Sequence, residues 1–213
     1  MELIVGAAGL DAYPGLEDYP LLLNSIDASD RPLGWDYESF MYLLKQLEGE
    51  KSNYVAFVNA SSDHTPFARM QEPFNKYEHG TDTEGGYLNM LHYTDWALGE
   101  FINEYKKRKD FEETIFIITA DHALPHFQGA EPYGKFRIPL IIYSPKNISP
   151  GRSQMFASQI DLFPTIIKLL DLEGKYSAIG KNILDTEKSF AVVKDGALLE
   201  IFSKEGFLVH NLK

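Results

Sequence analysis

The chain has 213 residues, 44% hydrophobic and 24% charged, which are values of a folded globular protein with a core of ordinary size. Its formal net charge of −11 argues against a surface that binds nucleic acid or an anionic membrane, because lysine and arginine hold phosphate groups. The sequence has no cysteine, which excludes disulfides, thiolate metal sites and cysteine nucleophiles.

The beginning of the chain predicts an irregular segment followed by a helix. Residues 1–33 include a stretch rich in aspartate, proline and serine and are expected to be an irregular lead-in segment. Their apolar opening is too short for a membrane span and lacks the basic start of a signal peptide, so the chain as given is expected to be soluble. Asp36 can cap a helix that ends near Gly49, with apolar residues at helical spacing: Phe40, Leu43, Leu44 and Leu47.

Two apolar runs on either side of a long helix predict a crossover connection. Residues 53–60, NYVAFVNA, are apolar enough for a buried central strand, and residues 114–122, TIFIITADH, predict a second one. Residues 87–109 carry an apolar stripe and end in four basic residues, as expected of a long helix. A strand, a helix and a strand in this order predict parallel pairing of the two strands. The segments SSDHTPF and ADH would then lie at the same edge of the sheet.

The rest of the chain predicts a third strand, a further helix and a set of hairpins. Residues 138–144 form another apolar run that is closed by a proline. Residues 157–170 predict a helix that begins near Asp161, since Pro164 suits only a first turn, and four residues are expected to face inward: Ile160, Phe163, Ile167 and Leu170. Between 190 and 210, three short apolar runs are separated by hairpin-type turns, which predicts an antiparallel meander.

Together these elements predict an α/β fold. Its centre is expected to be a mixed, largely parallel sheet flanked by helices, followed by a C-terminal antiparallel meander. We expect a single domain over residues 1–213, with its core in residues 34–184 and its C-terminal strands in residues 185–213.

Asp121 and His122 are the candidate metal ligands. They follow the second apolar run, and open α/β sheets bind their ligands at such strand ends. An aspartate oxygen beside a histidine nitrogen suits Zn²⁺ or Mn²⁺ better than Ca²⁺. The alternative is that Asp121 caps the following turn and His122 is an ordinary loop histidine. Further carboxylates are available, but nothing in the spacing selects one of them: Asp63, Glu131 and Asp161.

His64 is a candidate for binding a phosphoryl or sulfuryl oxygen, because an imidazole can donate a hydrogen bond to it. The alternative is a loop histidine that caps a turn before Thr65. His126 is a weaker candidate for the substrate. Other histidines are expected to have no such role: His92 packs in the long helix, and His79 and His210 are solvated.

No nucleophile is identified. Four hydroxyl residues lie near the candidate histidines, yet none occupies a strand-to-helix elbow that would expose it: Ser61, Ser62, Thr65 and Thr119. The sequence also contains no phosphate-binding loop of the Walker type and no GxGxxG segment after a strand.

The segments NASSDHTPF, HYTDWALGEFINEYKKRKDFEETIFIITADH, KFRIPLIIYSPKNISPG and ASQIDLFPTIIKLL resemble the sulfatase-like branch of the alkaline phosphatase superfamily. Within that branch the chain is most similar to the C-terminal part of lipoteichoic acid synthases and related phosphoglycerol transferases. The resemblance runs in one order from about Gly34 to Leu184.

The resemblance implies a metal-dependent enzyme acting on an anionic phosphate or sulfate ester. Asp121 and His122 would be metal ligands, for Mn²⁺ first and otherwise Zn²⁺, Mg²⁺ or Ca²⁺, and His64 would bind the phosphate ester. His126 inherits no firm role, since residues after the Asp-His pair vary in the family. The reaction would be phosphoglycerol transfer or phosphodiester hydrolysis, with sulfate-ester hydrolysis as the alternative. The parent protein would work at the extracytoplasmic face of a bacterial membrane.

The chain departs from the family at the nucleophile. Members begin their catalytic domain with a strand that carries an acidic ligand, followed by a threonine, or in sulfatases a modified cysteine or serine, at a helix start. Residues 1–33 resemble the region after that nucleophile. We therefore expect a fragment of a membrane-anchored enzyme, inactive alone, whose metal site can be empty and whose membrane association lies outside these residues. The alternative is a non-catalytic binding or regulatory domain derived from such an enzyme.

Overall fold

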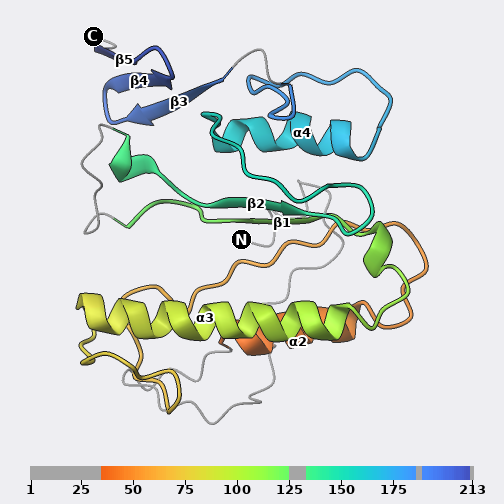
Figure 1. The fold of residues 1–213 in the computed structure, drawn as a ribbon, viewed down its shortest axis with the longest axis vertical. Coiled ribbons are helices and arrows are strands. Elements are labelled where there is room, and N and C mark those ends of the chain that lie inside the picture. Colours follow the sequence, from red (N-terminus) through yellow and green to blue (C-terminus); the bar gives the residue numbers. More distant parts are fainter. Residues whose placement is uncertain (1–34, 125–132, 186–188, 212–213) are drawn as a thin grey trace. The chain divides into compact units, whose positions relative to one another are not determined.

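The computed structural model describes residues 35–124, 133–185 and 189–211 (Figure 1). It divides into two compact units, Met1–Phe111 and Glu112–Lys213, called the N-terminal and C-terminal units below. The expectation of one domain stays a prediction. No helix in the described part of the chain is both long and apolar enough to cross a membrane.

Two helices packed side by side form the frame of the N-terminal unit (Figure 1): α2, Asp36–Gln46, and α3, Glu84–Tyr105. Gly49, with a φ of 81°, follows α2 near the predicted end of that helix. At the start of α3 the Thr83 hydroxyl accepts a hydrogen bond from the Gly86 amide at 3.2 Å, which caps the helix. Both predicted helices are therefore confirmed.

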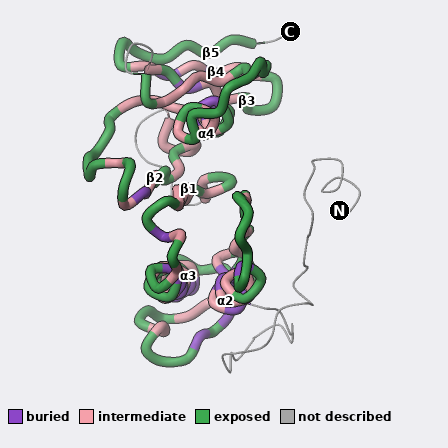
Figure 2. The backbone as a smooth tube through the Cα atoms, turned by 90° about the vertical axis from the view of Figure 1, so that its right-hand side faces the viewer, coloured by how far each residue is buried: buried purple, intermediate pink, exposed green. Residues whose placement is uncertain are grey.

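The core of the N-terminal unit lies between α3 and the irregular segment that precedes it, where Figure 2 shows buried backbone. Tyr93 of α3 is fully buried, and Phe74 of the preceding segment meets its ring edge-on at 5.3 Å between centroids. Burial raises the pKa of Tyr93. Six buried residues form the centre of this core: Trp35, Phe67, Ala68, Met70, Met90 and Tyr93.

The predicted strand at residues 53–60 is wrong. That segment forms no strand, and its Val55 and Phe57 side chains are each 80% exposed. The segment is tied down near its start, where the Tyr54 hydroxyl donates to Asp110 at 2.8 Å. An apolar segment forms a strand only where another strand completes its backbone hydrogen bonds. The sequence of the segment does not predict which strand that is.

The C-terminal unit contains a two-stranded and a three-stranded sheet. β1, Phe116–Thr119, pairs antiparallel with β2, Leu140–Tyr143, with Thr119 opposite Leu140. The expected parallel pairing of residues 53–60 with residues 114–122 would join the two units and stays a prediction, whereas every described strand pair is antiparallel. Two short 3₁₀ helices flank these strands: η2, Phe111–Glu113, and η3, Gly134–Phe136.

The C-terminal meander is confirmed. β3, Phe190–Asp195, pairs antiparallel with β4, Leu198–Ser203, which pairs antiparallel with β5, Phe207–Asn211. Gly196 and Gly206 have positive φ values of 57° and 147° in the connecting turns, a conformation that favours glycine. Helices and sheets together with this meander confirm the α/β expectation.

Helix α4, Leu162–Leu169, follows a 3₁₀ turn, η4, Gln159–Asp161, and in both views it lies between the two sheets of its unit (Figures 1 and 2). Pro164 lies in the first turn of α4, as predicted. The expected inward stripe is wrong, because Phe163 is 50% and Leu170 45% exposed whereas Thr165 is fully buried. Thr165 is held by hydrogen bonds, since its hydroxyl donates to the Asp161 carbonyl at 2.6 Å and accepts from the Ile183 amide at 3.0 Å. Ile160, which precedes α4, is 44% exposed.

Candidate metal-binding and phosphate-ester site

Asp121 and His122 lie just beyond the end of β1. The Thr119 hydroxyl at that strand end donates to the Pro139 carbonyl at 2.8 Å, which keeps β1 joined to the residue before β2. The chain then leaves the sheet, and the side chains of Asp121 and His122 are 78% and 64% exposed. The strand thus presents both side chains to solvent, where a ligand can reach them.

The two side chains are oriented by short local hydrogen bonds. Asp121 Oδ1 accepts from the His122 amide at 2.8 Å, and His122 Nδ1 lies 3.0 Å from the Ala123 carbonyl oxygen. A carbonyl oxygen can only accept, so Nδ1 carries the hydrogen and the neutral ring keeps its lone pair on Nε2. That Nε2 atom lies 3.7 Å from Asp121 Oδ2.

This geometry fits a chelate. Two donors bound to one tetrahedral metal ion at about 2.1 Å lie about 3.4 Å apart, and the free Oδ2 and Nε2 atoms are 3.7 Å apart. The bond from Nδ1 to a backbone carbonyl is also the contact that commonly fixes a ligating histidine. The described residues contain no group of three or more potential ligand side chains, so Asp121 and His122 would supply two positions of a candidate site.

In the N-terminal unit, the ring of His64 is also oriented by a contact of its Nδ1 atom with the carbonyl of the next residue. Its side chain is exposed, its amide donates to the Ser61 carbonyl at 3.2 Å, and its Nδ1 lies 2.6 Å from the Thr65 carbonyl oxygen. Nδ1 therefore carries a hydrogen, and Nε2 is the atom that faces a ligand. The Asp63 carboxylate beside it adds to burial in raising the pKa of Tyr87.

Asp36 holds the loop that carries His64, a role that the sequence did not reveal. The expectation that Asp36 caps α2 is wrong, because Trp35 occupies the N-cap position. Instead its buried carboxylate accepts from the Ser61 and Ser62 amides, each at 3.0 Å, and from the Thr94 hydroxyl at 2.6 Å. Aspartate serves both as a helix cap and as a loop anchor, so residue type alone does not separate these two roles.

Several other candidates have structural roles. The buried Asp161 carboxylate accepts a hydrogen bond from the Ser158 amide at Oδ2 and one from the Lys181 amide at Oδ1. It is therefore not available as a further ligand. The Ser62 hydroxyl is buried and accepts from the Asp36 amide at 3.0 Å. The ring of His92 packs against Phe74, as expected.

His79 was expected to be solvated, and this is wrong. Both of its ring nitrogens are buried, without a hydrogen-bond partner among the described residues. Burial, together with the charge of Arg69, lowers the pKa of His79. His126 and Glu131 lie outside the described residues. His64 belongs to one unit and the Asp121–His122 pair to the other, so their convergence stays a prediction.

The sequence model of the sulfatase family matches residues 4–172, most of the chain. The chain belongs to the sulfatase family. This sulfatase-family chain is 26% identical to the lipoteichoic acid synthase of Staphylococcus saprophyticus over 173 residues, which cover 74% of the chain and 27% of the relative. It is also 26% identical to lipoteichoic acid synthase 2 of Bacillus subtilis over 177 residues, 74% of the chain and 26% of the relative. The sulfatase-family chain thus spans about a quarter of the length of these relatives.

Solved structures support the same fold. A protein in the alkaline phosphatase superfamily from Vibrio parahaemolyticus superposes with a TM-score of 0.75 at 24% identity, over 95% of this sulfatase-family chain and 50% of the other. The structure of Ps i-CgsB in complex with k-i-k-neocarrahexaose superposes with a TM-score of 0.63 at 18% identity, over 83% and 47% of the two chains. These superpositions show the fold, and the predicted family is confirmed by the match to the sulfatase family model.

Proposed function

We propose that this chain is the metal-bearing part of a phosphoglycerol transferase of the sulfatase family. Asp121 and His122 ligate the metal ion, and His64 binds the phosphate ester. The observation that carries the proposal is the convergence of Asp121 Oδ2 and His122 Nε2, 3.7 Å apart, on the exposed side of a strand end. The similarity to two lipoteichoic acid synthases favours phosphoglycerol over a sulfate ester as the transferred group.

Members of this superfamily generally depend on divalent metal ions. Mn²⁺ suits one carboxylate oxygen and one imidazole nitrogen, and Zn²⁺, Mg²⁺ and Ca²⁺ are the other candidates. When bound, the ion would withdraw charge from the oxygens of the ester. Asp121 brings one negative charge and His122 none, so the loaded pair keeps a positive charge for an anionic ester on a chain of net charge −11.

His64 has a narrower role than the sequence alone suggested. Its Nδ1–H is committed to the Thr65 carbonyl, so a phosphate oxygen can be reached only from Nε2. Nε2 donates a hydrogen bond only when the ring is protonated, and the imidazolium then forms a charge-assisted hydrogen bond to the phosphate. His64 therefore binds an anionic ester as a cation. We place this work at the extracytoplasmic face of a bacterial membrane, as the resemblance to lipoteichoic acid synthases implies.

Replacing His122 with alanine is expected to weaken Mn²⁺ binding by about 100-fold, because it removes one of the two proposed donors among the described residues. Isothermal titration calorimetry of the full 213-residue chain with MnCl₂ measures the change. His210→Ala is the matched control, since His210 is an exposed histidine of the same unit on β5. Equal Mn²⁺ affinity in the His122 variant and the wild type would contradict the assignment of the metal ligands.

Replacing His64 with alanine is expected to weaken binding of sn-glycerol 1-phosphate about tenfold, because a charge-assisted hydrogen bond contributes about 1.5 kcal/mol. Titration followed by NMR gives the dissociation constant. Lys76→Ala is the control, because it removes an exposed positive charge from another segment of the same unit. An equal loss of affinity in both variants would show that the effect comes from removing a positive charge and not from a hydrogen bond of His64.

The same titration separates the two ester classes. The family name keeps sulfate esters as the second candidate. Tighter binding of methyl sulfate than of glycerol phosphate, lost in the His64 variant, would favour that candidate over phosphoglycerol.

A further inference from the structure

The two proposed metal ligands stand on irregular chain. β1 ends at Thr119, and residues 120–124 form neither helix nor strand. The local hydrogen bonds of Asp121 and His122 join them only to their own neighbours. Something outside this segment must fix its backbone if the two donors are to converge on one ion.

That contact comes from Gln159 in η4, 38 residues further along the chain. Its Nε2 atom donates to the Ala120 carbonyl at 3.0 Å and to the Asp121 carbonyl at 2.7 Å. Both partners are carbonyl oxygens, which only accept, so the amide nitrogen and not the amide oxygen must face them. One side chain therefore uses both of its amide hydrogens on two consecutive peptide groups.

We propose that Gln159 is a positioning residue for the metal ligands Asp121 and His122. The inference rests on the proposed function, because it takes these two residues as ligands. The Ala120 carbonyl belongs to the peptide group before Asp121, and the Asp121 carbonyl belongs to the group before His122. Fixing both groups fixes the direction in which each ligand side chain leaves the backbone.

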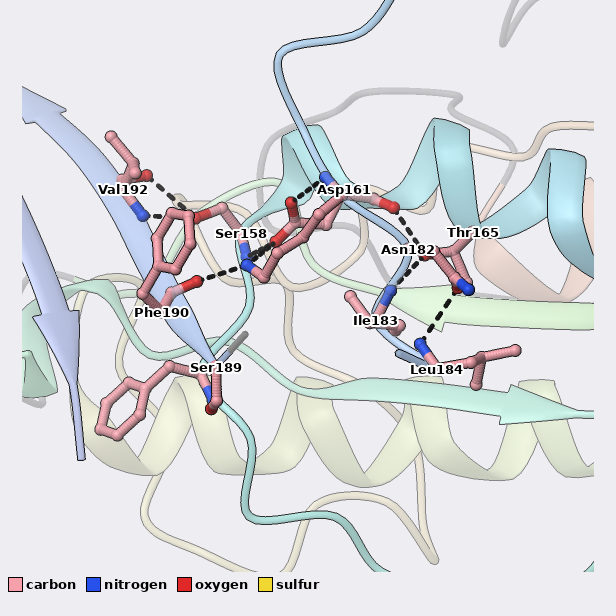
Figure 3. A network of polar contacts seen from close by, with 11 residues as sticks. Ser158, Asp161, Thr165, Asn182, Ile183, Leu184, Ser189, Phe190 and Val192 are labelled. Atoms are coloured by element: carbon pink, nitrogen blue, oxygen red, sulfur yellow. Dashed lines mark hydrogen bonds and ion pairs between the residues drawn. The ribbon is translucent and has the colours of Figure 1, made fainter. Parts of the chain in front are cut away.

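The backbone that carries Gln159 is anchored through its neighbour Ser158, which belongs to the network shown in Figure 3. The preceding residue, Ser158, donates its amide to Asp161 Oδ2 at 2.8 Å, which is half of a capping box at the start of η4. The Ser158 hydroxyl also accepts from the Val192 amide at 2.7 Å and donates to the Val192 carbonyl at 3.0 Å. Gln159 thus extends from a backbone that is bonded both to η4 and to β3.

This arrangement links the C-terminal meander to the proposed metal ligands through a short chain of hydrogen bonds. β3 holds Ser158, Ser158 begins η4, and the side chain of Gln159 reaches back to the residues after β1. Residues that orient metal ligands from outside typically change metal affinity by about 10- to 100-fold when they are replaced. Gln159 acts on the ligand backbone, so the lower end of that range is expected.

The test compares Gln159→Met, which keeps the length of the side chain and removes both donors, with Gln154→Met. Gln154 is an exposed glutamine of the same segment, and it provides the matched control. Calorimetry with MnCl₂ on the full chain is expected to give about tenfold weaker binding for Gln159→Met only. Long-range ¹H–¹⁵N NMR of the metal-free chain reports the His122 tautomer. The wild type and Gln154→Met should show Nδ1–H, and Gln159→Met a mixture of the two tautomers.

The outcomes separate the inference from the proposed function. If the wild type binds no Mn²⁺ and Gln159→Met alone changes the His122 tautomer, the metal proposal fails and Gln159 still positions the pair. If Mn²⁺ affinity and tautomer both match the wild type, the inference is overturned. A lower melting temperature for Gln159→Met with unchanged affinity and tautomer also overturns it, because the residue would then serve only stability.

Discussion

Replacing Asp36 with alanine is expected to lower the free energy of unfolding of the N-terminal unit by about 3 kcal/mol, because the buried Ser62 amide and the partly buried Thr94 hydroxyl lose a charged acceptor. The Asp36 side chain is 1% exposed and accepts hydrogen bonds from two amides of the His64 loop and from Thr94 on α3. Without the carboxylate, the Ser62 amide and the Thr94 hydroxyl must find water in a packed environment. The loop and the helix would then separate.

Tryptophan fluorescence in a urea titration measures this loss selectively. The chain has two tryptophans, and both Trp35 and Trp96 belong to the N-terminal unit. Asp95→Ala is the control, since Asp95 is an exposed aspartate next to Thr94 on α3, and its replacement should change the unfolding free energy by less than about 0.5 kcal/mol. Asp36→Asn keeps the shape of the side chain and removes its charge, so its free energy of unfolding should lie between those of Asp36→Ala and Asp95→Ala. Equal urea midpoints for Asp36→Ala and Asp95→Ala would show that the hydrogen bonds of the Asp36 carboxylate contribute nothing to stability.

The elements that the sequence predicted well have their determinants close together in the chain. The start of α4 follows from Asp161 and Pro164, which suit a cap and a first turn. The C-terminal hairpins follow from short apolar runs separated by turns with Gly196 and Gly206. In each of these cases the residues that decide the structure are within a few positions of one another.

The errors concern partners that lie far apart in the sequence. The run at 53–60 has the composition of a buried strand, yet it forms no strand and its Val55 and Phe57 side chains are exposed. The apolar stripe of α4 has helical spacing, but Thr165 and not Phe163 faces inward, because hydrogen bonds from residues after α4 hold that side. Periodicity identifies an element and leaves open what covers it.

The residues of the candidate site show the same difference between local and distant determinants. Asp121 and His122 were found because two ligand types follow one apolar run, a pattern that is visible in adjacent residues. Gln159 was missed because its contacts are with backbone carbonyls, which every residue carries, so the sequence holds no matching pattern at the other end. Asp36 was assigned to the nearest helix start because its partners include backbone amides, which nearly every residue carries.

Replacing Asp161 with alanine is expected to destabilise the C-terminal unit by about 3 to 4 kcal/mol, because the partly buried Lys181 ammonium loses its carboxylate partner and two amides lose their acceptor. Asp161 is 2% exposed, and it accepts from the Ser158 amide at 2.8 Å and from the Lys181 amide at 2.8 Å. The Lys181 ammonium lies 3.3 Å from the same carboxylate. Figure 3 shows Asp161 within this network.

Thermal unfolding followed by circular dichroism gives the global effect, and hydrogen exchange at the Val192 amide gives the local one, since that amide donates to the Ser158 hydroxyl at 2.7 Å. Glu173→Ala, which removes an exposed carboxylate after α4, is the control and should leave both unchanged. If the capping box carries the stability, Lys181→Met should lose only about 1 kcal/mol, because the amides of residues 158 and 181 keep their acceptor.

The relative stability losses of Asp161→Ala and Lys181→Met distinguish the capping box from the ion pair as the source of stability. A loss for Lys181→Met as large as that for Asp161→Ala would assign the stability to the ion pair and contradict the capping-box account. The expected order also bears on the proposed ligands, because Ser158 and Gln159 share the turn that Asp161 organises. Asp161→Ala should therefore weaken Mn²⁺ binding together with stability, whereas Gln159→Met should weaken Mn²⁺ binding and leave the melting temperature near that of its control.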